Sequence, residues 1–175
     1  FDLFFEPSAR TYIFRGWDVD TDIVTENMHI YPIFEEDPNA ITIPVDTIDE
    51  NGEIKTIQVR GYALDTNAEA LGAIINNHRK THDIEALEIS SKLNQAALER
   101  AAQVSVHFDH KSPTGLDFNQ AAKYAMFANG ENIAAGSEFA ENTFTQWKNS
   151  PGHNTNMLRQ GFKAYGSAGF IPEIG

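Results

Sequence analysis

The sequence contains no cysteine among its 175 residues. Disulfide bonds, thiolate metal sites and a cysteine nucleophile are therefore excluded for this chain. The absence does not identify a compartment, because a reducing cytosol and the secretion of a thiol-free protein are both compatible with it. Any metal or acid–base chemistry must come from the histidines, the acids and the hydroxyl groups.

Long apolar runs and an excess of basic residues are also missing. No stretch approaches the roughly 18 consecutive apolar residues of a membrane-spanning helix. The formal net charge of −12 argues against a nucleic-acid partner. The sequence has no phosphate-binding loop, no dinucleotide fingerprint and no G-x-S-x-G serine motif. No signal peptide is visible and the chain starts at Phe1 without a methionine, so we expect it to be a piece of a longer protein.

The first third of the chain has the pattern of β-strands, because aromatic and β-branched residues gather in short runs broken by glycine and proline. The stretch ITIPVDTIDENGEIKTIQVRGY at 41–62 has two alternating runs around Asn51-Gly52, which predicts a hairpin. Pro44 marks its first strand as an edge strand or a bulged one. We expect a β-rich module over 1–63 and a second domain over 64–175.

Helical periodicity follows the predicted hairpin. Thr66 and Glu69 have the pattern of a capping box, which predicts the start of a helix that runs to Arg79. Further helices are predicted over 90–106, where alanines form much of the apolar stripe, and over 117–126 and 138–148. The letters NSPGH end the last of these, and GFKAYGSAGFIP is typical of a glycine-punctuated strand.

Six histidines are the first candidates for chemistry. His78 and His82 are four residues apart on a predicted helix and could share a metal ion, although no glutamate follows His78 as it does in H-E-x-x-H. The alternative is that both histidines only pack in the core. His29 lies in an alternating strand pattern and is expected to be structural.

Three other residues lie in segments rich in turn formers. His110 belongs to HFDHKSPTG, Glu131 to GENIAAG and His153 to NSPGHNTN. Loops held by helices commonly carry functional groups. Each of the three is either part of one site or a loop residue satisfied by the backbone and water.

Five segments occur in a characteristic order, namely IINNHRKTHDIEALEISSKLNQAALERA, HFDHKSPTG, GENIAAG, TFTQWKNSPGHNTNML and AYGSAG. In this order they resemble the bacterial branch of the CAP superfamily, also called SCP-like. The superfamily is named for cysteine-rich secretory proteins, antigen 5 and pathogenesis-related proteins. The resemblance covers residues from about 68 to 170.

The resemblance implies an α+β fold, a three-layer α-β-α sandwich with a large central cleft, preceded here by the small β-rich module. Many members line the cleft with two histidines and two acids. By motif, the histidines are His110 and His153, and the first acid is Glu131. The segment WKNS at 147–150 has no acid where many eukaryotic members carry the second one. Members usually continue into a last aromatic-rich strand, so we expect further residues after Gly175.

The N-terminal stretch YIFRGWDVDTDIVTENMHIYPIFEE is similar to the tail of an internalin-type β-grasp repeat found in surface proteins of Gram-positive bacteria, also known as a Listeria-Bacteroides repeat. Gly16-Trp17, residues 25–31 and Phe34 fit its pattern. Both resemblances imply an extracellular or cell-wall-associated protein.

Two imidazoles and a carboxylate suit a zinc-like ion with water in the fourth position. His110 and His153 would be its ligands and Glu131 an additional one, and the metal would lower the pKa of its water. The competing hypothesis makes Glu131 architectural, accepting hydrogen bonds from either histidine or from backbone N–H groups. Asn132 and Ser150 are the expected supporting residues of this cleft.

Three functions follow from these hypotheses. The first is a secreted or wall-attached binding protein whose extracellular ligand is a protein, peptide, glycan or lipid. The second is a metal-assisted hydrolase of peptides or envelope polymers, for which the sequence identifies neither a general base nor an oxyanion donor. The third is a lipid or small-molecule carrier, which is less favoured because the sequence shows no long apolar loop.

Overall fold

The structure is a computed structural model that describes residues 12–18 and 30–173, with the backbone alone at 65–67. The described part is a mixed α+β arrangement with four α-helices and three small sheets. His29 and most of the predicted repeat pattern at 25–31 lie outside the described residues.

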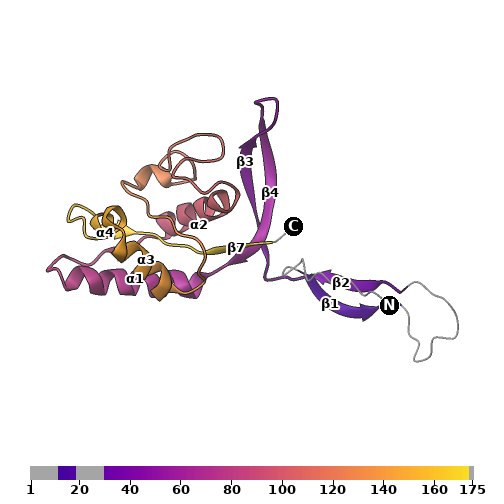
Figure 1. The fold of residues 1–175 in the computed structure, drawn as a ribbon, viewed down its shortest axis with the longest axis horizontal. Coiled ribbons are helices and arrows are strands. Elements are labelled where there is room, and N and C mark those ends of the chain that lie inside the picture. Colours follow the sequence, from indigo (N-terminus) through magenta and orange to yellow (C-terminus); the bar gives the residue numbers. More distant parts are fainter. Residues whose placement is uncertain (1–11, 19–29, 174–175) are drawn as a thin grey trace.

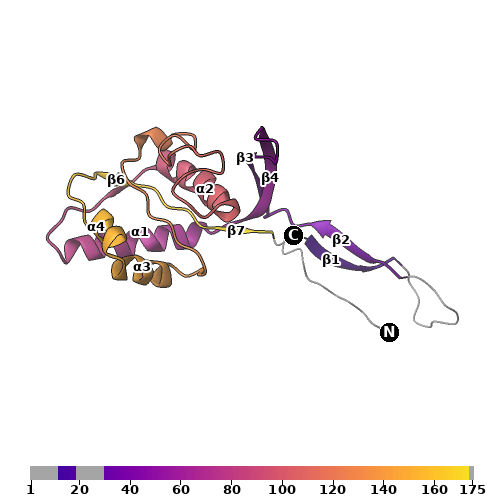
Figure 2. The same cartoon turned by 45° about the horizontal axis from the view of Figure 1, so that its top comes forward.

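The helices form two layers with the C-terminal strands between them. Helices α1 (Asp65–Lys80), α3 (Ala140–Asn149) and α4 (Pro151–Met157) lie on one side in Figures 1 and 2, and α2 (Ser91–Val106) lies on the other. Helix α1 contacts α3, and α2 contacts the strand β7 (Phe170–Pro172). This arrangement is consistent with the expected α-β-α sandwich.

The predicted hairpin is confirmed. Strand β3 (Ile41–Ile48) pairs antiparallel with β4 (Ile54–Ala63), and Gly52 in the turn has φ of +83°. Only glycine adopts that conformation without strain. In the sheet order β3-β4-β7, β3 is an edge strand, as Pro44 predicts.

Two smaller pairs complete the described strands. Strands β1 (Tyr12–Trp17) and β2 (Pro32–Glu36) form an antiparallel pair, which Figure 1 shows apart from the helices. Strands β5 (Glu88–Ile89) and β6 (Ala164–Tyr165) pair in parallel and join the start of α2 to the C-terminal segment.

Each helical layer is packed around its own hydrophobic cluster. One cluster lies between α1, α3 and α4 and is built on Leu71, Ile75, Ala140 and Met157. The other lies between α2 and the β3-β4-β7 sheet and is built on Ile43, Val45 and Ala102. Because residues 41–63 share a sheet with β7 and a cluster with α2, contacts cross the boundary expected at 63/64. That boundary stays a prediction.

The connection between β2 and β3 is fastened to β4. The Tyr62 hydroxyl donates to Asp37 at 2.9 Å, and the Arg60 guanidinium donates to the Asp37 carbonyl at 3.3 Å. Hydrogen bonds from the Asn39 backbone and from Tyr62 lower the pKa of the Asp37 carboxyl. The β1–β2 pair is thus joined to the larger sheet through a hydrogen-bonded turn.

Two predicted helix starts differ from the structure. Helix α1 begins at Asp65 with Leu64 at its N-cap, so Thr66 lies in the first turn and the predicted capping box is wrong. Helix α2 has Ser90 as its N-cap, whose hydroxyl accepts from the Leu93 N–H, and this start is confirmed.

The helix predicted over 117–126 is wrong, because the segment contains turns and only the short 3-10 helix η1 (Ala125–Phe127). Side chains of α2 take the backbone groups that a helix would pair. Gln103 donates to the Ala121 carbonyl, and Glu99 accepts from the Lys123 N–H.

The segment NSPGH ends one helix and begins another. Ser150 has an extended backbone, as expected before a proline. Pro151 then occupies the first position of α4, where its missing N–H costs nothing. His153 is therefore helical, which corrects its expected place in a turn.

Arg79 is fully buried and fastens the C-terminal end of α4 to α1. Its guanidinium donates to the carbonyls of Glu85, Met157 and Arg159 at 2.7–3.1 Å. Burial lowers the pKa of Arg79, but an arginine keeps its charge in proteins.

Replacement of Arg79 tests how much it contributes to the stability of the fold. Arg79→Met leaves three carbonyls without a charged donor, and we expect a loss of about 2–4 kcal/mol in the free energy of unfolding, measured by denaturant titration. Lys163→Met is the matched control, because the Lys163 side chain forms an exposed ion pair with Glu85, and its loss should change the free energy of unfolding by less than about 1 kcal/mol. Equal effects of the two variants would contradict this role.

Candidate functional site

Glu131 is bound by a buried arginine. Arg100 of α2 donates through Nε to Glu131 Oε2 at 2.9 Å and through Nη2 to Oε1 at 3.2 Å. Arg100 is 5% exposed, and the Glu131 side chain is 13% exposed. Such a two-pronged, charge-assisted pair compensates for the removal of both charges from water.

The sequence interpretation did not include Arg100. Its signal is nevertheless present, because Leu93, Ala97, Arg100 and Val104 follow one another at helical spacings of four, three and four. An arginine in the apolar stripe of a helix must find an anionic partner inside the protein. Glu131 is that partner.

His110 shares the same carboxylate. Its Nδ1 lies 3.0 Å from Glu131 Oε1, while its side chain is 54% exposed. The Arg100 guanidinium also donates to the carbonyl of Asp109 at 3.0 Å. One arginine therefore holds both the GENIAAG segment and the residue before His110.

The GENIAAG segment is also fastened to α4. The Asn132 side chain donates to the His153 carbonyl at 3.2 Å and accepts from the Asn156 amide at 2.9 Å. A Cβ on Gly130 would lie 2.5 Å from Asn156 Oδ1 and 2.8 Å from Phe162 Cζ. The backbone at 130 therefore packs closely against these two side chains, which favours glycine there.

His153 lies in the first turn of α4 and is oriented by its neighbours. Its Nδ1 is 2.8 Å from the Ser150 hydroxyl, and its ring stacks on Trp147 with centroids 6.4 Å apart. The Trp147 indole donates to the Ile133 carbonyl at 3.1 Å, so the tryptophan on which His153 stacks is hydrogen-bonded to the GENIAAG segment.

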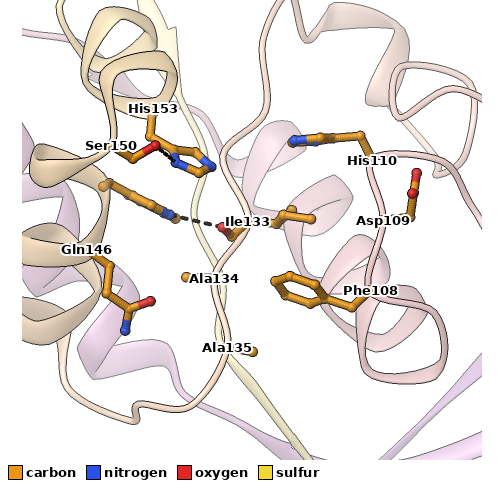
Figure 3. Close-up of a pocket in the computed structure, with 10 residues that line it drawn as sticks. Phe108, Asp109, His110, Ile133, Ala134, Ala135, Gln146, Ser150 and His153 are labelled. Carbon is orange, nitrogen blue, oxygen red and sulfur yellow. Dashed lines mark hydrogen bonds between the residues drawn. The ribbon is translucent and has the colours of Figure 1, made fainter.

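A pocket of about 600 Å³ separates the two histidines (Figure 3). His110 and His153 extend into it from opposite sides, with Ile133 between them in this view. Five of the lining residues are apolar, namely Phe108, Ile133, Ala134, Ala135 and Trp147, and five are polar, namely Asp109, His110, Gln146, Ser150 and His153. Glu131 is not among these lining residues and is hydrogen-bonded to Arg100 of α2.

A larger cavity, of about 1040 Å³, lies between the helical layers. Apolar side chains of α1 and α2 contribute to its walls, among them Leu71, Ile75, Leu93 and Val104. The Arg100–Glu131 pair also borders it.

The rings of His78 and His82 pack edge-on against each other, with centroids 4.7 Å apart, and each histidine has further contacts. His78 is buried, its Nε2 lies 2.8 Å from Asn154 Oδ1, and its ring packs edge-on against Phe144. The Nδ1 of His82 lies 2.9 Å from the His78 carbonyl. His78 therefore connects α1 to the residue that follows His153.

The hydrogen bonds at the pocket engage Glu131 and the Nδ1 atoms of His110 and His153, and the zinc site suggested by the sequence stays a prediction. Both Glu131 oxygens are bound by Arg100, one of them also by His110, and His153 Nδ1 is engaged by Ser150. Within residues 12–18 and 30–173, no group of three or more histidine or acidic side chains is arranged to hold a metal ion.

Comparison with known families gives one match. Residues 73–168, more than half of the chain, match the family described as CAP, the cysteine-rich secretory protein family. Comparisons with curated proteins and with solved structures give no match. In the part of the chain that the structure describes, no helix is long and apolar enough to cross a membrane.

The close packing of Gly130 against Asn156 and Phe162 can be tested by substitution. Gly130→Ala places a methyl group against Asn156 and Phe162, and we expect a loss of about 1–3 kcal/mol in the free energy of unfolding. Gly152→Ala is the control, because its added methyl meets nothing within 4 Å and a helical alanine should stabilise α4 slightly. A Gly130→Ala protein as stable as wild type would contradict the packing described here.

Proposed function

Because the chain belongs to the CAP family, we propose that it is a binding protein that acts outside the cell, secreted by a Gram-positive bacterium or attached to its wall. The resemblance of residues 12–36 to a surface-protein repeat supports this location, and the absence of cysteine is compatible with it. In this proposal, the pocket between His110 and His153 is the ligand site.

The observation that carries the proposal is the commitment of Glu131 to Arg100. A general base needs a free carboxylate or imidazole next to the reacting group, and the ion pair with Arg100 makes Glu131 unsuited to that role, which argues against a hydrolase built on Glu131. The pocket combines five apolar with five hydrogen-bonding side chains, a mixture that suits a binding site.

An extended peptide is the ligand class that fits this lining best. Phe108 and Ile133 offer apolar surface for a side chain, while Gln146 and the two imidazoles offer hydrogen-bond partners for peptide groups. The net charge of −12 favours neutral or basic peptides over acidic ones.

Two alternatives keep their own supporting observations. A hydrolase is supported by the 2.8 Å contact between Ser150 and His153, although the serine meets Nδ1 and no acid hydrogen-bonds His153 within the described residues. A carrier of lipids or small apolar molecules is supported by the cavity of about 1040 Å³ between the layers.

Selection from a phage-displayed library of linear peptides tests the proposal. We expect enriched neutral or basic sequences, and we expect the Gln146→Ala/His153→Ala double variant to bind the corresponding synthetic peptide about tenfold more weakly or worse by calorimetry. His82→Ala is the matched control, because His82 is exposed and outside the pocket, and its affinity should equal that of wild type.

Three results would overturn the proposal. One is equal affinity of the pocket variant and wild type. Another is turnover of casein or peptidoglycan that Glu131→Gln abolishes, which would favour the hydrolase. The last is a lipid that co-purifies with the protein in native mass spectrometry, which would favour the carrier.

A further inference from the structure

Arg100 does not line the pocket, yet it contacts the two segments that place His110 there. It holds Glu131 with two nitrogens and the Asp109 carbonyl with one. We propose that Arg100 is the positioning residue of the site, which fixes His110 with a proton on Nδ1 and directs its unprotonated Nε2 into the pocket. That Nε2 meets a ligand there rests on the proposed function, whereas the positioning itself does not.

Positioning depends first on the rigidity of the Arg100 guanidinium. Its planar fork fixes the direction of each donor, so the Glu131 carboxylate and the Asp109 carbonyl are held at a set separation. The fourth contact, from Nη1 to Gln103 Oε1 at 2.7 Å, orients the guanidinium on α2 itself. His110 follows Asp109 directly and so leaves the backbone from a fixed point.

The charge of the Arg100–Glu131 pair then determines which nitrogen of His110 carries the proton. Arg100 places a permanent cation against the Glu131 carboxylate, whose side chain is only 13% exposed, so the two groups form an ion pair. An ionised carboxylate only accepts hydrogen bonds, so His110 Nδ1, at 3.0 Å from it, must be the donor.

The tautomer of His110 determines which ligand group its other ring nitrogen, Nε2, can bind. A neutral imidazole with its proton on Nδ1 has an acceptor at Nε2. Figure 3 shows the His110 ring directed toward His153 across the pocket. The ligand group that meets His110 is therefore a hydrogen-bond donor, such as a peptide N–H, a hydroxyl or an ammonium group.

Imidazole ¹⁵N–¹H correlation spectra of the whole chain, recorded where His110 is neutral, test the proposal. We expect the Nδ1–H form alone for His110 in wild type. In Arg100→Gln we expect that form to be lost in favour of the mixture of a free histidine. Arg100→Lys, which keeps the charge without the fork, should lie between the two. Arg159→Gln, at an exposed arginine that contacts Phe162, is the control and should match wild type.

A wild-type spectrum in which His110 carries its proton on Nε2 would overturn the proposal by itself, even if Arg100→Gln fails to fold. An Arg100→Gln protein that folds and keeps the Nδ1–H form would overturn it as well. If the tautomer responds as expected but no peptide is selected, the positioning stands and the proposed function fails.

Discussion

The ion pair between Arg100 and Glu131 is the constraint on which the site depends. Both side chains are almost removed from water, and removing either one alone would leave a buried charge without a partner. The pair therefore requires α2 and the GENIAAG segment to meet at one place. Because the same guanidinium holds the Asp109 carbonyl, the histidine loop is placed by that meeting as well.

The second wall of the pocket is placed by a separate set of contacts. Asn132, the residue after Glu131, hydrogen-bonds the His153 carbonyl and the Asn156 side chain. The GENIAAG segment is therefore bound to α2 through Glu131 and to α4 through Asn132. His78 and Arg79 then connect α4 to α1. The two histidines are thus brought to one pocket, although His110 lies in the loop after α2 and His153 lies in α4.

The sequence predicts the elements whose signals are local. Asn51-Gly52 identifies the hairpin, and the alanine-rich stripe identifies the helix that ends at 106, because turn chemistry and periodicity act over a few residues. The failures arise where a distant side chain decides. In the segment 117–126, Gln103 of α2 binds the Ala121 carbonyl, a contact that local periodicity does not reveal. Arg100 lies in the stripe of its helix, but its partner Glu131 is 31 residues away, so the local pattern does not identify the pair. The resemblance brought His110, Glu131 and His153 to attention, but which atoms of these residues are free is visible only in the structure.

A double-mutant cycle on the free energy of unfolding tests the central claim most directly. Arg100→Met and Glu131→Met should each cost about 3 kcal/mol or more, since each leaves the other charge buried alone. The double variant should cost less than the sum of the two by at least about 1 kcal/mol, because it removes both charges together. Additivity within about 0.5 kcal/mol would mean that the two residues do not interact, and would contradict the account of the site.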